Sequence, residues 1–415
     1  MRGPTQHIFD HTPDSLAAWC DARGMPVYRA SQILEWVYRR GVIEPEAMTN
    51  LPKALRAVLA SEMAFESGHT VATQRASDGV RKLLIEWEEV GAPGDDRSLP
   101  VLGAEASRGS APARQTECVM IPAGGETDER PSRREGERAS RRTACISSQV
   151  GCPVGCRFCA SGLGGLDGNL SAGRIVEQVW RLDRLVRTER DNRWRERPAP
   201  VNASPRGSNV PPPPNERGIT NVVFMGMGEP LANFQSVMRA VRTLAAPWGM
   251  HLSARKITIS TVGLHVAIEK LADELEVPVT LALSLHAPND ALRRELIPWA
   301  EFTSIEQLLV ACDRWFAKTG REITLEYTLL RGVNDTDGCA AELAEVARRL
   351  RSNVNLIRFN EVDGVPFERP QDSRVRAVQK ILRDRGVNAH IRASRGRDIA
   401  AACGQLRHET AAPTR

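Results

Sequence analysis

From residue 143 onward, short runs rich in β-branched residues alternate with longer amphipathic segments. This alternation predicts a parallel sheet whose strands are joined by crossover helices. Six such repeats suit a partial or complete (β/α) barrel of the α/β class. The expected strands lie within 143–149, 219–226, 255–261, 277–286, 321–330 and 353–360. The expected helices between them lie within 172–186, 234–245, 265–275, 304–318 and 340–351.

The segments before residue 143 have a different pattern. Residues 1–65 predict a small helical domain, because apolar residues recur at three- and four-residue spacing. The next region, 66–142, contains a predicted β-hairpin that turns at Ser77, Asp78 and Gly79. The barrel domain would then cover 143–410. Three stretches rich in Gly, Pro, Ser or charge are expected to be flexible insertions without a catalytic group: 91–114, 123–140 and 197–218.

Charge and hydropathy limit the class of protein. The net charge is +5, from 56 basic and 51 acidic residues, and arginines cluster in 130–142 and 181–198. Such clusters permit a polyanionic partner without establishing one. No segment approaches the roughly 18 apolar residues that a membrane helix needs, and the first residues lack an apolar signal region. We therefore expect a cytoplasmic protein, in which cysteines stay reduced.

Four of the nine cysteines lie in CISSQVGCPVGCRFC, residues 145–159. Cys152, Cys156 and Cys159 have the spacing C-x3-C-x2-C, which is typical of a metal centre. Zinc would normally take a fourth ligand from a second short-spaced pair, and the sequence has no second CxxC. Iron–sulfur clusters usually have four cysteine ligands, so three would leave one iron open. The spacing alone allows either metal.

Polar groups follow several of the expected strands. GMGEP (226–230) comes directly after the second strand, although Gly-rich strand ends are often ordinary turns. Ser260 and Ser284 end the next two strands, His286 follows the second of these, and Asn360 ends a later one. In barrels the working groups lie at the carboxyl ends of strands. These side chains are therefore expected to meet near the cysteines.

The cysteine triad, with Phe158 before its last cysteine, resembles the radical S-adenosylmethionine (SAM) enzymes. The resemblance implies a 4Fe-4S cluster on Cys152, Cys156 and Cys159, whose open iron chelates SAM. It also implies a set of SAM contacts: Gly228, Glu229, Ser260, Ser284, Leu285, His286 and Asn360.

A narrower resemblance covers nearly the whole chain outside the three insertions. It rests on the strings MTNLPKALR, CISSQVGC, VVFMGMGEPLAN, ALSLHAPND and RGRDIAAACGQL. These resemble the dual-specificity adenosine C2 methyltransferases of 23S ribosomal RNA and transfer RNA, and their sister C8 methyltransferases. The resemblance implies that Cys403 carries the methyl group, Cys145 is the resolving thiol and Glu117 is the proton acceptor. Without it, Cys403 would be interpreted as a buried small residue.

The chemistry explains why the family needs two further thiols. Carbon 2 of adenine is electron-poor and cannot attack a sulfonium methyl group directly. The implied route uses two SAM molecules: Cys403 accepts a methyl group from one, and a radical made from the other activates that methyl group. The base then becomes tethered to Cys403, and Cys145 releases it by forming a disulfide bond.

The expected partners are RNA and a low-potential electron donor such as a flavodoxin, with no membrane and a monomeric chain. Two alternatives remain open: C8 methylation, and a non-catalytic, zinc-stabilised RNA-binding protein. The sequence departs from the family pattern at Gly168, where a basic residue is usual, and at 359–361, where Phe-Asn-Glu replaces aromatic-Asn-Pro. These positions leave regiospecificity and RNA choice open.

Overall fold

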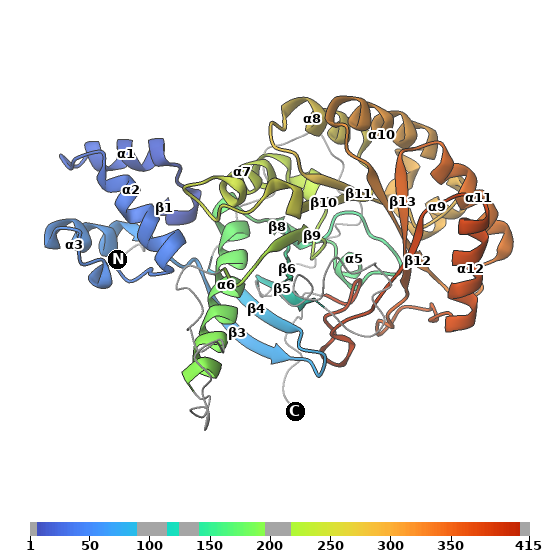
Figure 1. Cartoon of the computed structure of the whole chain (residues 1–415), viewed down its shortest axis with the longest axis horizontal. Helices are drawn as coiled ribbons and strands as arrows, with labels where there is room; N and C mark the ends of the chain where they lie inside the picture. Colours follow the sequence, from blue (N-terminus) through green and yellow to red (C-terminus); the bar gives the residue numbers. More distant parts are fainter. Residues whose placement is uncertain (1–5, 89–113, 124–140, 196–216, 407–415) are drawn as a thin grey trace, which may run out of the picture.

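Strands from both halves of the chain form one ten-stranded sheet in the computed structural model, which describes residues 6–88, 114–123, 141–195 and 217–406. The spatial order is β14-β13-β12-β11-β10-β9-β6-β5-β4-β3, so the sheet is open and forms a partial barrel (Figure 1). Its strands are β3 (Gly68–Arg75), β4 (Arg81–Trp87), β5 (Gln115–Pro122), β6 (Arg142–Cys145), β9 (Asn221–Phe224), β10 (Ile257–Thr261), β11 (Thr280–Ser284), β12 (Ile323–Leu329), β13 (Ser352–Arg358) and β14 (Ala389–Arg392).

The sheet is mixed. Strands β6 and β9 to β14 pair in parallel, as the β/α alternation predicted. Strands β3, β4 and β5 pair antiparallel and are added beside β6. The predicted hairpin is confirmed: β3 and β4 are joined by a turn in which Ala76 N donates to Val80 O at 2.9 Å. Gly79 takes a φ of +87° there, a conformation that favours glycine. The hairpin therefore extends the barrel sheet.

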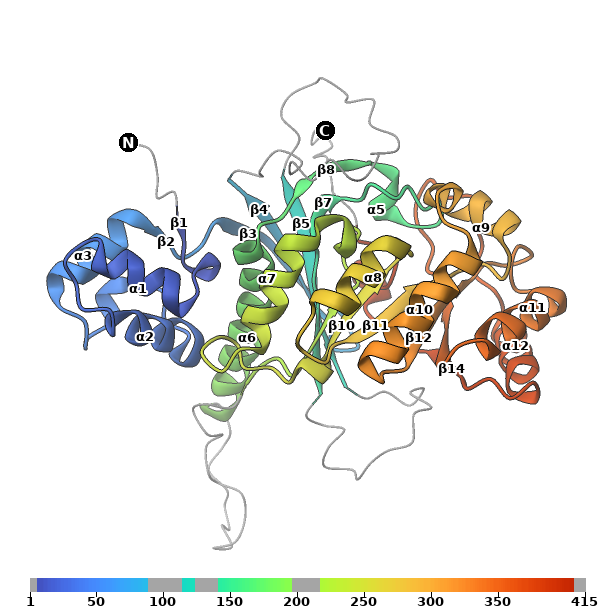
Figure 2. The same cartoon turned by 90° about the horizontal axis from the view of Figure 1, so that it is seen from above.

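Helices cover the outer face of the parallel strands (Figure 2). They are α6 (Ala172–Arg195), α7 (Phe234–Ala245), α8 (His265–Glu274), α9 (Asp290–Leu296), α10 (Ile305–Thr319), α11 (Asp337–Arg348) and α12 (Asp372–Asp384). Local sequence sets their ends: α10 starts with a reciprocal capping box between Ser304 and Gln307 and stops at Gly320, whose φ is +64°. A short hairpin, β7 (Gln149–Gly151) and β8 (Leu166–Asn169), and helix α5 (Ala160–Leu163) flank the cysteine loop.

The N-terminal region is helical, as expected, and packs against α6. It contains α1 (Pro13–Asp21), α2 (Arg29–Leu34), which continues as a π-helical turn over Glu35–Arg40, and α3 (Lys53–Glu62). The short strands β1 (Gln6–His7) and β2 (Met63–Ala64) pair in parallel. Trp180 of α6 donates to Val37 O at 2.9 Å, and its ring lies 5.8 Å from that of Phe9. The apolar core therefore continues from the barrel into this region.

Several elements were not expected from the sequence: the hairpin of β7 and β8, helices α5, α9 and α12, and strand β14. Strand β14 adds a seventh parallel strand to the six that were expected, at the edge of the sheet. Strand β14 has only four residues, AHIR, whose burial alternates, so its pattern is the shortest that can indicate a strand. The three expected insertions lie almost entirely outside the described residues.

Candidate active site

Two adjoining cavities lie on the inner face of the sheet. One, of about 160 Å³, is lined by Cys152, Cys156 and Cys159, and we call it the triad cavity. The other, of about 280 Å³, has basic residues in its lining, and we call it the basic cavity. The triad cavity lies at the carboxyl ends of the parallel strands, as the barrel pattern predicted. Five residues line both cavities: Met225, Glu326, Ile357, Arg392 and Cys403.

The cysteine loop brings its three thiols close together. Hydrogen bonds from Cys152 N to Gly165 O at 2.7 Å and from Cys159 N to Cys156 O at 3.2 Å fold the loop back on itself. Burial raises the pKa of all three thiols, and neighbouring thiols raise that of Cys156 further, well above its ordinary value. Three thiolates placed here therefore need a positively charged partner.

The GMGEP segment forms one wall of the triad cavity. Gly228 has a φ of +99°, and a Cβ there would lie 2.7 Å from Gln149 Cβ. Glu229 accepts hydrogen bonds from Leu231 N at 2.9 Å and from Val262 N at 2.8 Å. Burial raises the pKa of this carboxyl to about 7. The carboxylate of Glu229 thus connects the loops that follow β9 and β10. Because the glycines of this segment have no side chain, their backbone faces the cavity.

Side chains at the ends of β10 and β11 line the same cavity. Ser260 and Ser284 are hydrogen-bonded through their hydroxyls at 3.2 Å. His286 Nδ1 accepts from Thr328 N at 3.0 Å, so the neutral ring carries its proton on Nε2. Burial, and then the charge of Arg293, lowers the pKa of His286 to about 3. Leu285 is buried and is not among the lining residues of either cavity.

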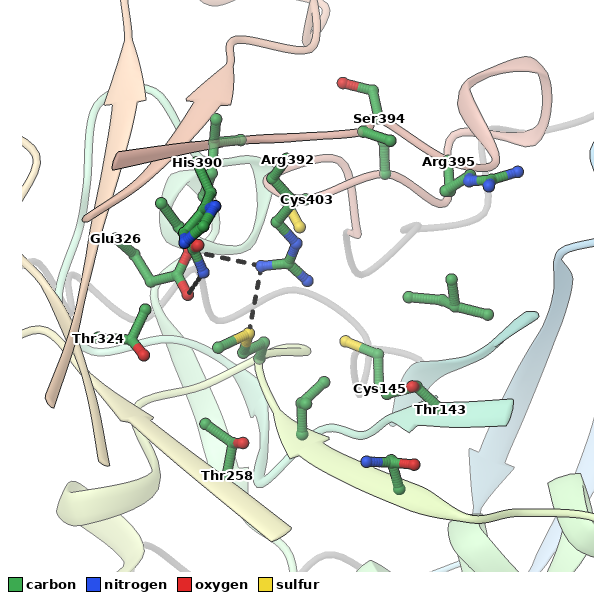
Figure 3. A pocket seen from close by; sticks show the side chains of 18 of the residues that line it. Thr143, Cys145, Thr258, Thr324, Glu326, His390, Arg392, Ser394, Arg395 and Cys403 are labelled. Carbon is green, nitrogen blue, oxygen red and sulfur yellow. Dashed lines mark hydrogen bonds and ion pairs between the residues drawn. The ribbon is translucent and has the colours of Figure 1, made fainter. Parts of the chain in front are cut away.

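The two thiols outside the triad differ in position. Cys145, at the carboxyl end of β6, is buried and lines the basic cavity. Cys403, in the loop after β14, lines both cavities. Burial and the Cys403 thiol raise the pKa of Cys145 to about 12, whereas Arg392 lowers it. The Cys403 thiol is therefore close enough to Cys145 to influence its pKa, and Figure 3 shows both side chains at the basic cavity.

Hydrogen bonds hold the Cys403 loop from several sides. Asn360 Nδ2 donates to Cys403 O at 3.1 Å, and Ala160 N donates to Gly404 O at 2.8 Å. The hairpin turn also reaches this loop, because Asp78 Oδ2 accepts from Gly396 N at 2.9 Å. Asn360 lines the basic cavity, whereas it was predicted to contact SAM.

Glu117 lies on β5 and is almost fully buried, where the sequence alone would leave it exposed. Its Oε1 pairs with Lys82 Nζ at 2.6 Å. Lys82 also donates to Ala400 O at 3.4 Å, three residues before Cys403. Glu117 is not among the lining residues of either cavity. It is connected to the Cys403 loop through its ion pair with Lys82, which in turn donates to Ala400 O.

Arg392 was missed by the sequence analysis. It ends β14 and lines both cavities. Its Nη1 lies 3.5 Å from Glu326 Oε2 and 3.5 Å from Met225 Sδ (Figure 3). The only signal in the sequence was an arginine within the short run AHIR, which was not read as a strand.

Comparison with known proteins agrees with this geometry. Residues 6–64 match the ribosomal RNA large subunit methyltransferase N-terminal domain, and residues 214–344 match the radical SAM superfamily. The dual-specificity RNA methyltransferase RlmN of Dichelobacter nodosus is 37% identical over 403 residues, 96% of this chain and 93% of the relative. A protein of Rhodopirellula baltica described as "Probable dual-specificity RNA methyltransferase RlmN" is 36% identical over 98% of this chain and 92% of its own length.

The chain belongs to the RlmN family of dual-specificity RNA methyltransferases. A crystal structure of a radical SAM methyltransferase from Sphaerobacter thermophilus superposes with a TM-score of 0.79 at 38% identity, covering 97% of this chain and all of that one. The family resemblance and the radical SAM barrel with its N-terminal helical domain are therefore confirmed.

Membership in the RlmN family and the radical SAM superfamily implies a 4Fe-4S cluster and SAM. The residues fit such a cluster, because three partly buried thiols line one cavity with no cation among its lining residues except Arg392. Across the described ranges, no group of three or more His, Cys, Asp or Glu side chains is arranged to bind one metal ion.

The expectation of a disulfide bond is not supported. All nine cysteines lie in described residues, and all are free thiols, including Cys145 and Cys403. Within the described ranges, no helix of this RlmN family member has the length and apolar character needed to cross a membrane.

Proposed function

We propose that the chain is a radical SAM methyltransferase that methylates carbon 2 of an adenosine in 23S ribosomal RNA, transfer RNA or both, through a methyl group carried on Cys403. One observation carries the proposal: Cys403 lines both cavities, whereas Cys145 lines only the basic cavity. A carrier thiol must meet the methyl donor on one side and the RNA base on the other, and a resolving thiol needs to reach only the tethered base.

Residues of the triad cavity would hold the cofactors. Cys152, Cys156 and Cys159 are the proposed cluster ligands, and Gly228, Ser260, Ser284 and His286 would contact SAM, with Glu229 fixing the loop. When bound, the cluster and SAM supply the methyl group and the radical chemistry that activates it, at two SAM molecules per turnover. Neither Leu285 nor Asn360 lines the triad cavity, so both would act indirectly: Leu285 through its loop, and Asn360 through its side-chain hydrogen bond to Cys403 O.

The basic cavity would admit the target nucleotide. Its lining includes Arg141, Arg255, Lys256 and Arg395, whose charges favour a phosphate-bearing partner. A base must leave its stack to reach buried thiols, so the target adenosine would be flipped or unpaired. Glu117, paired with Lys82, is the proposed proton acceptor. A flavodoxin-like electron donor, a monomeric state and a cytoplasmic location stay predictions.

The reaction is tested by anaerobic incubation of the cluster-loaded protein with SAM, a reductant and either 23S ribosomal RNA or transfer RNA. Mass mapping of the nucleosides should find a methyl group on carbon 2 of adenosine. Methylation at carbon 8 would instead support the sister activity, and absence of methyl transfer to either RNA would contradict the proposal. Cys403→Ala serves as the inactive control.

The role of Cys145 has a separate test. Cys145→Ala should trap a denaturant-resistant adduct between the protein and RNA, because the tethered base can no longer be released. Cys118→Ala is a matched control: Cys118 is a buried thiol on the neighbouring strand β5 that lines neither cavity, and its loss should leave no adduct. Unchanged turnover in Cys145→Ala would rule out the resolving role.

A further inference from the structure

One carboxylate oxygen at the junction of the two cavities has no hydrogen-bond donor. Glu326 lies on β12, is 4% exposed and lines both cavities. Its Oε1 accepts from Asn355 Nδ2 at 3.0 Å, whereas its Oε2 accepts no hydrogen bond from any described residue. A buried carboxylate oxygen without a donor is costly. Because this oxygen belongs to a lining residue, a bound ligand can supply the donor that the protein does not.

The other side chains of the lining show why this acceptor is distinctive. Glu229 is the other acidic residue that lines either cavity, and its two oxygens already accept from Leu231 N and Val262 N. The threonine and asparagine side chains of the basic cavity can each donate as well as accept. An ionised carboxylate only accepts. Glu326 can therefore distinguish a ligand amino group from a carbonyl oxygen at the same place.

A donor lies directly beside this acceptor. Arg392 Nη1 is 3.5 Å from Glu326 Oε2, and Figure 3 shows the guanidinium group next to the carboxylate. The same nitrogen donates to Met225 Sδ at 3.5 Å, which helps to hold the guanidinium group in place. Adenine presents the complementary pair, an amino group next to an unprotonated ring nitrogen, whereas guanine has a carbonyl oxygen in place of the amino group. The two side chains therefore fit adenine and oppose guanine.

We propose that Glu326 selects adenine at the target position: its Oε2 accepts a hydrogen bond from the exocyclic amino group of the target base, while Arg392 donates to the neighbouring ring nitrogen. The inference rests on the proposed function, in which the substrate is an adenosine. Glu326 is a specificity-determining residue in this scheme and takes no part in the transfer of the methyl group.

Two adenines present this chemistry, that of the target nucleotide and that of SAM. The target is favoured because Asn355, which holds the Glu326 carboxylate through Oε1, lines the basic cavity and not the triad cavity. Thr324, two residues before Glu326 on the same face of β12, also lines the basic cavity alone. The adenine of SAM is the alternative that the experiment separates.

The test uses two RNAs, one with adenosine at the position found by nucleoside mapping and one with purine riboside there, which lacks only the amino group. The adenosine preference is the ratio of their single-turnover rates. In the wild-type protein it should exceed that of Glu326→Ala by about ten- to hundredfold, the scale of a hydrogen bond to a charged group. Other effects of the substitution act on both RNAs alike, so the ratio isolates the contact.

Two further variants complete the comparison. Glu326→Gln keeps the shape of the side chain and covers the case in which Glu326→Ala does not fold. Its adenosine preference should lie between those of the wild type and Glu326→Ala, because a neutral oxygen accepts more weakly than a carboxylate. The matched control is Glu361→Ala, which removes a carboxylate that is 71% exposed, pairs with Arg397 at 3.7 Å and lines neither cavity. This variant should keep the wild-type preference.

Equilibrium dialysis of SAM gives the second arm of the experiment. The affinity for SAM should be the same in the wild-type protein and in Glu326→Ala. If Glu326→Ala keeps the adenosine preference, the inference is overturned, and a simultaneous loss of SAM affinity would assign the carboxylate to the adenine of SAM.

A third measurement separates this inference from the proposed function. Filter binding compares hairpin RNAs whose loop holds a single adenosine or a single purine riboside among uridines, and it needs neither SAM nor a reductant. If no RNA is methylated, the proposed function fails, and tighter binding of the adenosine hairpin that is lost in Glu326→Ala would still support the inference, whereas equal binding would overturn it. Methylation with an adenosine preference that does not depend on Glu326 would defeat the inference alone.

Discussion

The triad cavity and the basic cavity share a wall but are built in different ways. In the triad cavity, side chains are committed to neighbouring backbone: Glu229 accepts from Leu231 N and Val262 N, and His286 accepts from Thr328 N. In the basic cavity, the lining combines several cations with the two free thiols Cys145 and Cys403. The side chains of the first cavity are fixed by hydrogen bonds to backbone, whereas the second contains free thiols. The lining residues that the two cavities share are Met225, Glu326, Ile357, Arg392 and Cys403.

The largest expected effect comes from removing the shared thiol. Cys403→Ala should lower RNA methylation by a factor of roughly 10⁴ or more, the scale on which covalent nucleophiles contribute. Iron and SAM binding should be unchanged, because the triad cavity keeps its other residues. Nucleoside mass spectrometry and iron analysis measure the two properties. Cys339→Ala, a half-buried thiol of α11 outside both cavities, is the control. Loss of iron in Cys403→Ala would show that the two cavities are not separable.

The second prediction concerns the buried ion pair between Lys82 and Glu117, in which Lys82 also contacts the Cys403 loop. Lys82→Met removes the ammonium group that pairs with Glu117 Oε1 in the interior, where the two side chains are 9% and 6% exposed. Breaking such a buried pair should lower the free energy of unfolding by about 3–5 kcal/mol, measured by chemical denaturation. The exposed pair Lys380–Asp384 provides the comparison, and Lys380→Met should change it by about 1 kcal/mol or less. Equal effects would mean that Lys82 is not structurally coupled to the site.

The third prediction uses pH to probe the triad cavity. Burial lowers the pKa of His286 to about 3 from an ordinary value of 6.5, so the unfolded chain binds the extra proton first as pH falls. The contribution of neutral His286 to stability is present above pH 6.5 and is lost between 6.5 and about 3. His286→Asn keeps an acceptor for Thr328 N but has no imidazole to protonate. The variant should therefore not show the fall in the free energy of unfolding, of the order of a few kcal/mol, that the wild-type protein shows over this pH range. Parallel unfolding curves for both proteins across that range would contradict this assignment.

The comparison also explains what the sequence could predict. Residues of the triad cavity lie in short strings that follow successive strands, so spacing and strand order place them together. Residues of the basic cavity come from distant strands, and Arg392 lies on β14, whose alternating pattern spans only four residues. Its pairing with Glu326 joins β12 to β14 across β13, a relation that only the strand order provides. Similarly, Lys82 and Glu117 meet only because β4 pairs with β5.

The smallest effect should come from Asn360, which was predicted to contact SAM but donates to Cys403 O at 3.1 Å. Loss of one such hydrogen bond in Asn360→Ala should cost about 1 kcal/mol, or roughly a fivefold fall in the single-turnover rate, because the loop places Cys403 between the cavities. The affinity for SAM should be unchanged. Gln405→Ala, which removes a more exposed hydrogen bond from the same loop to Glu361 O, should slow the reaction less. If Asn360→Ala instead weakens the affinity for SAM and leaves the rate unchanged, Asn360 contacts SAM, as the sequence predicted.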